Sequence, residues 1–266
     1  MAIQYSSSWI LNGFNQIITS WNTISSTKSI RTKIHQLKPL KVIVSTEKAV
    51  VMNKLSANDI SFNYNQKQVF HDVSFSVTQG EKILIGGKSG IGKSILIRMI
   101  LQELQPTTGK LLFNNHSYSQ VDSYNNFGIV GQTPIIFEDS LKNNITLGDD
   151  TADDQKVITA LKQSGLEEFA NETSLRMQIN ENGHNFSGGQ LKRIEIARAL
   201  YFNRQLLLID EGTASLDPET ATSIHESILN NKSLTVIEVD HHIPDEVKKL
   251  YDRVYELSNT GLTLQN

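Results

Sequence analysis

The sequence predicts an α/β fold, in which a mixed and largely parallel sheet is covered by helices, and two observations carry this prediction. From Leu55 onward, short apolar runs of strand length alternate with segments of helical periodicity, a pattern typical of parallel sheets packed under helices. A glycine-rich stretch at residues 87–94 separates one such run from the helix after it, as in a strand–loop–helix unit. With 266 residues, the chain is long enough for one large domain and an appendage.

The appendage is predicted at the N-terminus, in residues 1–40. Its apolar side chains recur with spacings of three and four residues, which places them on one face of an amphipathic helix. Pro39 fits the end of this helix, because proline disfavours helical backbone at the residue before it. Such an apolar face needs a partner surface, and we expect it to pack against another helix or another chain. The alternative is that it folds back on the chain's own domain. The apolar residues are Ile10, Phe14, Ile17, Trp21 and Ile24.

Residues 53–266 are predicted to form the main domain, with an antiparallel β subdomain near its start. Apolar and polar residues alternate in a first strand that reaches Tyr64, and a second strand at 69–77 follows a turn at 65–68. Residues from about 139 to 200 carry few strand signals and are expected to form a helical subdomain.

The composition is that of an ordinary soluble protein and argues against nucleic acid as a partner. The formal net charge is −3, and no cluster of Lys and Arg stands out, so no basic field attracts nucleic acid or an anionic membrane. Cysteine is absent, which excludes disulfides and thiolate metal sites. The start of the chain lacks a secretion-signal pattern, and no stretch reaches the roughly 18 apolar residues of a membrane-spanning helix. As given, the polypeptide is not expected to cross a bilayer.

The glycine-rich stretch matches the phosphate-binding pattern G-x-x-x-x-G-K-S, and its place between a strand and a helix is what this motif requires. Glycine lets backbone N–H groups turn toward phosphate oxygens, and the helix start adds partial positive charge. Lys93 would supply an ammonium group for the outer phosphates and Ser94 a hydroxyl ligand for Mg²⁺. The alternative is a glycine-rich turn that carries Lys and Ser by chance. The predicted nucleotide-binding residues are Gly87, Lys88, Ser89, Gly90, Ile91, Gly92, Lys93 and Ser94.

Two adjacent acids, Asp210 and Glu211, follow an apolar run at 206–209, which suits a strand buried on both faces. Strand ends in open α/β sheets present ligand-binding groups. Two carboxylates in one dry place repel unless they have separate tasks. Asp210 is therefore expected to hold Mg²⁺ through water, and Glu211 to orient or deprotonate the attacking water. The alternative is a strand that ends in a solvated acidic turn.

A Ser-Gly-Gly-Gln sequence opens a further helix of regular apolar spacing. Such a helix start can bind a second anion, or its serine can be an ordinary N-cap, and the residues alone leave both interpretations open. The residues concerned are Ser187, Gly188, Gly189 and Gln190.

Taken in order, these motifs resemble the ABC ATPase superfamily, from about Ser56 to the C-terminus. The phosphate loop comes first, then Ser-Gly-Gly-Gln with Arg193 three residues later, then the two acids, followed by Ser215, Leu216 and Asp217. Several independent motifs in this order make the resemblance specific. It implies a P-loop NTPase fold with a mixed sheet, an antiparallel β subdomain and a helical subdomain, which binds ATP and Mg²⁺ and hydrolyses ATP.

The resemblance assigns roles to three more residues. Tyr64 resembles the aromatic residue that stacks on adenine, with packing into the sheet as the alternative. Gln132, after an apolar strand, resembles the glutamine that ligates Mg²⁺ and communicates the state of the Mg²⁺ site to the transport partner. His241 resembles the switch histidine that contacts the γ-phosphate, where the alternative is a histidine on a polar surface. The expected catalytic residues are Lys93, Gln132, Glu211 and His241.

The resemblance also implies a partner chain. In this family the phosphate loop and the Ser-Gly-Gly-Gln sequence of one chain lie far apart. A second ABC ATPase chain, identical or different, would bind head-to-tail around two ATP molecules. Ser187, Gly188 and Gly189 would hold the γ-phosphate in the opposing site, and Asp217 would lie at the contact between chains. ATP would hold the chains together, and hydrolysis would reopen them.

Three stretches resemble exporters in particular. Residues 180–183 resemble in part the loop that exporter ATPases place against coupling helices, and residues 151–170 resemble their helical subdomain. Residues 9–37 resemble the cytoplasmic end of the last membrane helix of fused exporters. We therefore expect the chain to power export from the cytoplasmic side of the cell membrane, held there by an ABC transmembrane domain. The transported substrate is not encoded in these motifs.

The two alternatives to export are a soluble, non-transport ABC ATPase and a truncated ATP-binding fragment that is inactive without its membrane domain. Three residues depart from the family's usual pattern. Phe186 stands where leucine is commonest, and little loss is expected because it stays apolar. Asp240 and His242 flank His241, and the acid is expected to favour a proton on His241 and so slow the switch.

Overall fold

The computed structural model describes residues 51–65, 67–118 and 123–265. The predicted amphipathic helix of residues 1–40 lies outside this part of the chain. Within the described residues, no helix has the length and the apolar character needed to span a membrane.

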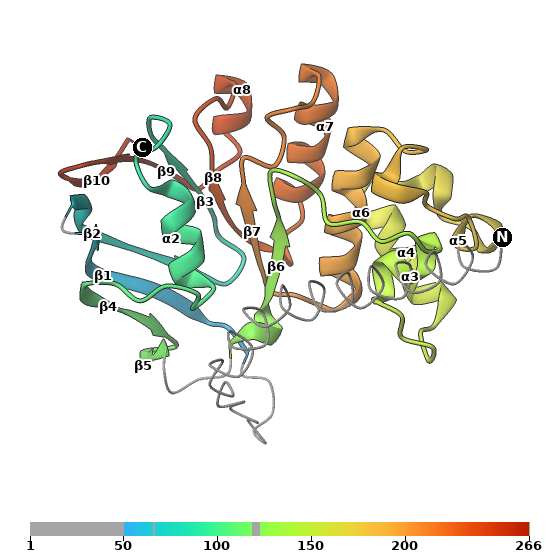
Figure 1. The fold of residues 1–266 in the computed structure, drawn as a ribbon, viewed down its shortest axis with the longest axis horizontal. Coiled ribbons are helices and arrows are strands. Elements are labelled where there is room, and N and C mark those ends of the chain that lie inside the picture. The colour runs from blue at the N-terminus through green and yellow to red at the C-terminus, as the bar shows by residue number, and fades with distance from the viewer. Residues whose placement is uncertain (1–50, 66, 119–122, 266) are drawn as a thin grey trace, which may run out of the picture. The chain divides into compact units, whose positions relative to one another are not determined.

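Among the described residues, six strands form the main sheet, in the order β10–β9–β3–β8–β7–β6 (Figure 1). The strands from β9 to β6 pair in parallel, and β10 pairs antiparallel with β9. The prediction of a mixed and largely parallel sheet is therefore confirmed. The strands are β3 (Lys82–Gly86), β6 (Phe127–Val130), β7 (Leu206–Asp210), β8 (Thr235–Val239), β9 (Arg253–Ser258) and β10 (Gly261–Leu264).

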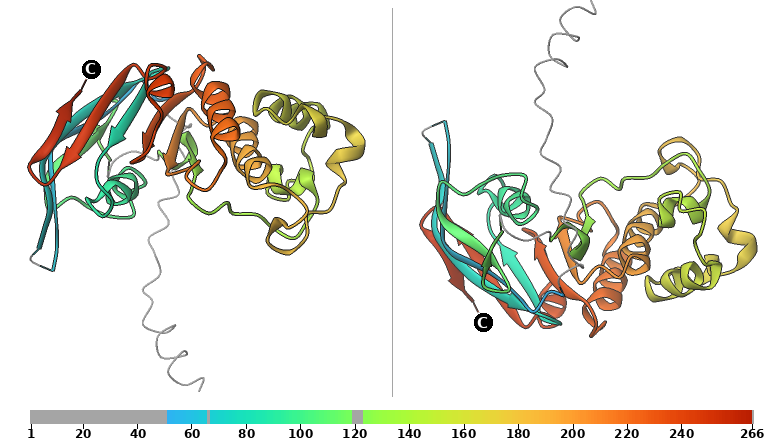
Figure 2. Two further views of the ribbon diagram at one scale, coloured as in Figure 1. Left: turned by 90° about the horizontal axis from the view of Figure 1, so that it is seen from above. Right: turned by 90° about the horizontal axis from the view of Figure 1, so that it is seen from below.

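The three central strands, β3, β8 and β7, are buried on both faces, which explains their unbroken apolar runs. Ile83 and Ile85 pack into the core on one side of the sheet, and Leu84 packs on the other. One side is covered by α2, which lies between the two sheets of the fold, and the other by α6, α7 and α8 (Figure 2). These helices are α2 (Lys93–Ile100), α6 (Gly188–Tyr201), α7 (Pro218–Leu229) and α8 (Asp245–Lys248).

A second sheet, of four strands within the described residues, has the order β2–β1–β4–β5 and is antiparallel throughout. The predicted antiparallel β subdomain is therefore confirmed. Lys67 and Gln68 pair with Tyr64 and Asn63, so the turn predicted at 65–68 is shorter than expected because both strands continue into it. The strands are β1 (Lys54–Tyr64), β2 (Lys67–Thr78), β4 (Thr108–Phe113) and β5 (His116–Ser117).

The chain between β6 and β7 is mostly helical and has a core of its own (Figure 1). Helix α6 joins this core to the main sheet, because Ile194 and Ala197 pack into the helical core whereas Ile196 and Ala199 pack against the sheet. The other helices here are α3 (Leu141–Thr146), α4 (Asp154–Gln163) and α5 (Glu172–Leu175), with the 3-10 turns η3 (Glu167–Phe169) and η4 (Glu181–Gly183); η2 (Tyr124–Asn126) precedes β6.

Candidate functional site

The glycine-rich stretch forms the loop between β3 and α2, and two of its glycines have no room for a side chain. At Gly92, φ is 110° and an added Cβ would lie 2.6 Å from Cγ1 of Val69. At Gly87, φ is 145° and an added Cβ would lie 2.8 Å from the carbonyl oxygen of Leu257. Only glycine adopts such backbone conformations readily. The fold itself therefore requires glycine at these two positions of the motif.

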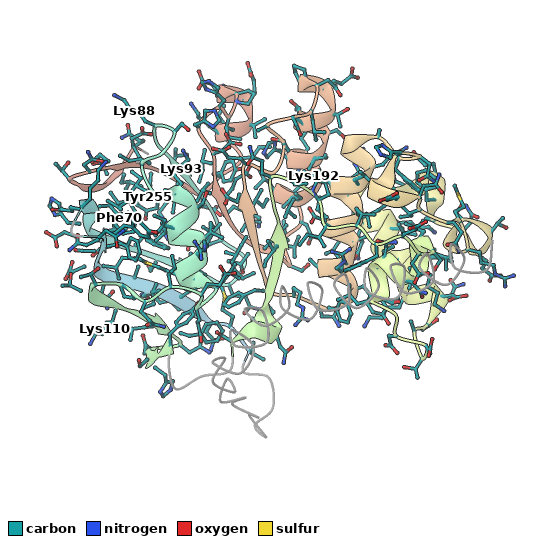
Figure 3. All side chains as sticks on the ribbon, in the orientation of Figure 1. Phe70, Lys88, Lys93, Lys110, Lys192 and Tyr255 are labelled. Carbon is teal, nitrogen blue, oxygen red and sulfur yellow. The ribbon has the colours of Figure 1, made fainter. Side chains whose placement is uncertain are left out.

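Lys93, the first residue of α2, is 4% exposed and lies against the loop (Figure 3). Its Nζ donates hydrogen bonds to the carbonyl oxygens of Gly87, at 2.7 Å, and Lys88, at 3.2 Å. The same atom lies 4.0 Å from Oε1 of Glu211. A buried ammonium group needs such partners. The predicted phosphate-binding lysine is thus held inside the loop, beside an acid from the second motif.

Ser94 and Asp210, two of the predicted Mg²⁺ ligands, are in contact: Oγ of Ser94 donates to Oδ1 of Asp210 at 3.0 Å. Burial raises the pKa of Asp210 more than the hydrogen bond from Ser94 lowers it, and the charge of Glu211 raises it further. Carboxylates and hydroxyls are hard oxygen donors, which Mg²⁺ prefers. Mg²⁺ is commonly bound by one or two carboxylates together with the phosphates of a substrate. In the described part of the chain, no group of three or more His, Cys, Asp or Glu could hold a metal. Ser94 and Asp210 thus have donor atoms that fit Mg²⁺, and its binding there stays a prediction.

Glu211 and His241 meet where the neighbouring strands β7 and β8 end. Oε1 of Glu211 lies 3.0 Å from Nδ1 of His241. The backbone N–H of Glu211 donates to the carbonyl oxygen of Val239 at 2.9 Å, and its φ is 48°. Positive φ is uncommon for residues other than glycine, and such strained residues gather at functional sites. The structure thus brings two predicted catalytic side chains into direct contact.

Asp240 is 3% exposed, and its Oδ1 accepts hydrogen bonds from two backbone N–H groups, of His241 at 2.5 Å and of His242 at 2.8 Å. Short aspartate side chains commonly close turns in this way. Asp240 therefore shapes the turn that presents His241, a role that sequence analysis missed because it considered only the charge. Its Oδ1 also lies 3.5 Å from Nδ1 of His241, and the expected effect on the proton of His241 stays a prediction.

Tyr64 lies at the end of β1 with 66% of its surface exposed. It therefore does not pack into the sheet, which was the alternative to adenine stacking. Phe62 is the residue that does so: it is buried, and its ring centroid lies 6.5 Å from that of Phe70. The exposed ring of Tyr64 is free of the core, and its role toward adenine stays a prediction.

Gln132 follows β6 in the loop that leads into the helical subdomain, and its side chain is exposed. Among the described residues, no hydrogen bond joins it to Ser94 or Asp210. Its backbone oxygen instead accepts a hydrogen bond from Nζ of Lys192 at 2.9 Å. Lys192 and, one turn later on α6, Glu195 are buried charged residues that sequence analysis missed. No local pattern singles them out, because α6 carries two further charged residues, Arg193 and Arg198, that are not buried.

The Ser-Gly-Gly-Gln sequence caps α6. Oγ of Ser187 accepts from the N–H of Gln190 at 3.2 Å, and Oε1 of Gln190 accepts from the N–H of Ser187 at 2.8 Å, a reciprocal capping box. Asp217 is the N-cap of α7 and accepts from the N–H of Thr220 at 2.9 Å, with no reciprocal bond among the described residues. Strands β8 and β7 stand between α2 and α6 in Figures 1 and 2, so one chain does not bring this sequence to its own phosphate loop.

Several residues of the glycine-rich loop and of the Ser-Gly-Gly-Gln sequence face solvent in this chain, whereas Gly189 is packed against α7. A Cβ added at Gly189 would lie 2.5 Å from Cγ2 of Thr220. Phe186, next to the motif, is buried, and its ring centroid lies 5.1 Å from that of Phe169. The exposed members are Lys88, Ser89, Gly90, Ser94, Ser187 and Gly188.

Comparison with known proteins agrees with this geometry. The sequence model of the ABC transporter family matches residues 70–214. The glutathione/L-cysteine transport system ATP-binding/permease protein CydD of Bacillus subtilis is 33% identical over 195 residues, which are 71% of this chain and 34% of that protein. A protein of Staphylococcus aureus that is named as a multidrug export ATP-binding/permease protein is also similar. It is 32% identical over 202 residues, which are 73% of this chain and 35% of that protein. This chain thus spans about a third of the length of these relatives.

A solved structure is similar as well. A bacterial Atm1-family ABC exporter with ATP bound matches with a TM-score of 0.70 and 27% identity, over 82% of this chain and 40% of that one. The family match covers more than half of the chain and includes the phosphate loop, the Ser-Gly-Gly-Gln sequence and the acids after β7. The chain therefore belongs to the ABC transporter family, as one of its ATP-binding domains.

Proposed function

We propose that this chain binds ATP together with Mg²⁺ and hydrolyses it to power export by an ABC transporter. The observation that carries the proposal is the gathering of catalytic side chains at one edge of the main sheet. Ser94 contacts Asp210, while Glu211 contacts His241 and lies near Lys93. All follow the carboxyl ends of the parallel strands β3, β7 and β8, where open α/β sheets bind their ligands.

The loop between β3 and α2 is the part that holds the phosphates of ATP. Its backbone N–H groups and the start of α2 supply partial positive charge. The ammonium group of Lys93 turns from its carbonyl partners to the outer phosphates. Ser94, Asp210 and Gln132 hold Mg²⁺, whose contribution when bound is to neutralise phosphate charge. The exposed ring of Tyr64 stacks on adenine.

Glu211 is the group that acts on the attacking water. The water oxygen forms a bond to the γ-phosphorus while the bond from that phosphorus to the β–γ bridging oxygen breaks, and ADP leaves with the electron pair. The proton of the water passes to the carboxylate of Glu211. His241 contacts the carboxylate of Glu211 through Nδ1 and so fixes its orientation, and it also contacts the γ-phosphate.

A second ABC ATPase chain, identical or different, completes the site. Within one chain, Ser187 and Gln190 cap α6, Gln190 also donates to Oε1 of Glu168, and Asp217 caps α7. In a head-to-tail pair, residues 187–190 of one chain face the phosphate loop of the other, and Asp217 lies at the contact. Two sites related by a two-fold axis close around two ATP molecules.

An ABC transmembrane domain is the second partner that we propose. The relatives named above are ATP-binding/permease proteins, and this chain spans about a third of their length, so the permease part lies outside the matched residues. The chain then acts at the cytoplasmic side of the cell membrane, bound through that domain. Cosedimentation with membranes that contain a candidate transmembrane domain tests this, whereas cosedimentation with ribosomes would favour a soluble, non-transport ABC ATPase.

Phosphate release by the purified 266-residue chain tests the enzymatic part. With ATP and Mg²⁺, Glu211→Gln is expected to lower the rate by about 10²–10⁴-fold while ATP still binds, because a general base contributes a factor of this size. Glu226→Gln, a change of an exposed acid on α7, is the matched control and is expected to leave the rate unchanged. Equally slow hydrolysis by wild type and Glu211→Gln would contradict the proposal and favour a fragment that binds ATP without turnover.

A further inference from the structure

The loop that follows β6 crosses from the main sheet to the helical subdomain without secondary structure of its own, from Gly131 to Asp139. Backbone N–H and C=O groups in such a segment need hydrogen-bond partners. Gln132, the proposed Mg²⁺ ligand of this loop, lies one residue after its start. The position of Gln132 therefore depends on the side chains that form hydrogen bonds with the loop backbone.

Lys192 holds the first two residues of the loop. Its side chain is 1% exposed and extends from α6 (Figure 3). Nζ donates hydrogen bonds to the carbonyl oxygen of Gly131 and, at 2.9 Å, to that of Gln132. Hydrogen bonds from a charged donor are about twice as strong as neutral ones. One ammonium group thus fixes two successive carbonyls at the point where the loop leaves β6.

The next two turns of α6 hold the middle of the same loop. Oε1 of Glu195, a residue 3% exposed, accepts from the N–H of Ile135 at 2.9 Å, and Nη2 of Arg198 donates to the carbonyl oxygen of Ile135 at 2.9 Å. Residues spaced by three lie near one another on a helix surface, so Lys192, Glu195 and Arg198 form one row of charges directed at the loop.

Two of these three charged side chains, Lys192 and Glu195, are buried. Charge burial is unfavourable unless the charges are paired and hydrogen-bonded, and Oε2 of Glu195 has no hydrogen-bond partner among the described residues. The partners that Lys192 and Glu195 do have are backbone atoms of the loop. The hydrogen bonds of Lys192 and Glu195 therefore hold the loop backbone in place.

We propose that Lys192 is a positioning residue for Gln132, and that it sets the contribution of Gln132 to the Mg²⁺·ATP site. Lys192 lies on α6, the helix that residues 187–190 cap. Its hydrogen bonds to Gly131 and Gln132 therefore connect the residues that we propose face the partner's ATP with the Mg²⁺ site of the same chain. This inference rests on the proposed binding of Mg²⁺·ATP.

A pair of variants separates positioning from simple stability. Lys192→Met removes the donors but keeps a long apolar stem, and it is made in a Glu195→Gln background so that no unpaired buried charge is left. Glu195→Gln alone is the matched control, because the glutamine oxygen can still accept from Ile135 and Lys192 keeps both of its carbonyl partners. Lys192→Gln in the same background restores an N–H donor and is the rescue variant.

The affinity of the chain for a fluorescent ATP analogue is measured in EDTA and then during a titration with Mg²⁺. We expect the Mg²⁺ concentration at the midpoint of this titration to be about 10–100-fold higher for Lys192→Met/Glu195→Gln than for Glu195→Gln. Losing a group that orients a metal ligand usually has an effect of this size. Affinity in EDTA and the melting temperature without nucleotide should match those of the control, and Lys192→Gln should recover part of the loss.

Equal Mg²⁺ midpoints in the double variant and in Glu195→Gln would overturn the inference. An equal loss of affinity in EDTA and in Mg²⁺ would overturn it too, because the phosphate loop would then be damaged as a whole. Failure of the proposed function is a different result: the wild-type chain would bind the ATP analogue without any dependence on Mg²⁺, or would not bind it.

Discussion

Oε1 of Glu211 and Nδ1 of His241 lie 3.0 Å apart, and this contact joins the ends of β7 and β8. Each residue belongs to a different motif, separated by the whole of α7 and β8 in the sequence. The positive φ of Glu211 and the Asp240 turn place the two side chains against each other. The fold thus places the acid that we propose acts on water in contact with the histidine that we propose orients it.

The Asp240 turn offers a test of the charge beside His241. Asp240→Ser keeps an oxygen that can accept from the backbone N–H of His242 but removes the carboxylate 3.5 Å from Nδ1 of His241. Without this carboxylate, less negative charge lies near the γ-phosphate that we propose His241 contacts, so we expect the variant to hydrolyse ATP several-fold faster than wild type. ATPase rates of the two proteins measured side by side check this, and equal rates would contradict it.

Gly92→Ala is expected to unfold the chain more easily. The residue has φ of 110°, and the new Cβ would meet Val69 at 2.6 Å. We expect the free energy of unfolding to fall by about 1–3 kcal/mol from backbone strain, and to fall further from the clash with Val69. Urea denaturation measures the loss. Gly90→Ala is the control, since that glycine also has positive φ, 77°, but no atom within 4 Å of its Cβ position. Equal losses in both variants would show that the close approach of Val69 is unimportant.

A buried ionic cluster behind the site predicts a pH dependence of stability. Nε2 of His225 on α7 lies 2.9 Å from Oε1 of Glu238 on β8, whose Oε2 accepts from the hydroxyl of Tyr251. Burial lowers the pKa of His225, but the charge and hydrogen bond of Glu238, with a further contribution from Asp240, outweigh it and raise the pKa above 6.5.

Because the pKa of His225 is higher in the folded chain than in the unfolded one, the stabilisation is fully present below pH 6.5 and is lost as the pH rises through the folded value. Glu238→Gln should therefore cost about 1–3 kcal/mol in mildly acidic buffer, the size of a hydrogen bond to a charged group, and less in alkaline buffer. Urea denaturation of wild type and Glu238→Gln at two pH values measures the difference. A loss that grows with pH would have the wrong sign.

Much of the fold and part of the site could be predicted from the sequence, because the signals involved are local. Apolar runs of strand length gave the central strands, and the glycine pattern gave the loop before Lys93. The contact of Ser94 with Asp210 follows once parallel strands are assumed, since their carboxyl ends share one edge.

The remaining features depend on packing that one sequence does not reveal. Lys192 bonds to the loop after β6, across a separation of 60 residues, and no local pattern announces such a pairing. The bonds of Asp240 to its own turn depend on the backbone conformation after β8. The exposure of Tyr64, as opposed to Phe62, depends on irregular register in the pairing of β1 with β2, which interrupts the simple alternation of faces.

The central claim is that the phosphate loop of one chain works with the Ser-Gly-Gly-Gln sequence of another. The direct measurement is ATP hydrolysis by a mixture of two variants, Lys93→Met and Ser187→Asp. Asp is a good N-cap, so Ser187→Asp keeps the cap of α6 while it sets a negative charge against the γ-phosphate. Each variant alone is expected to be inactive. A mixed pair has one site with both parts intact, so mixing should restore activity. No recovery on mixing, or full activity of Ser187→Asp alone, would contradict the claim.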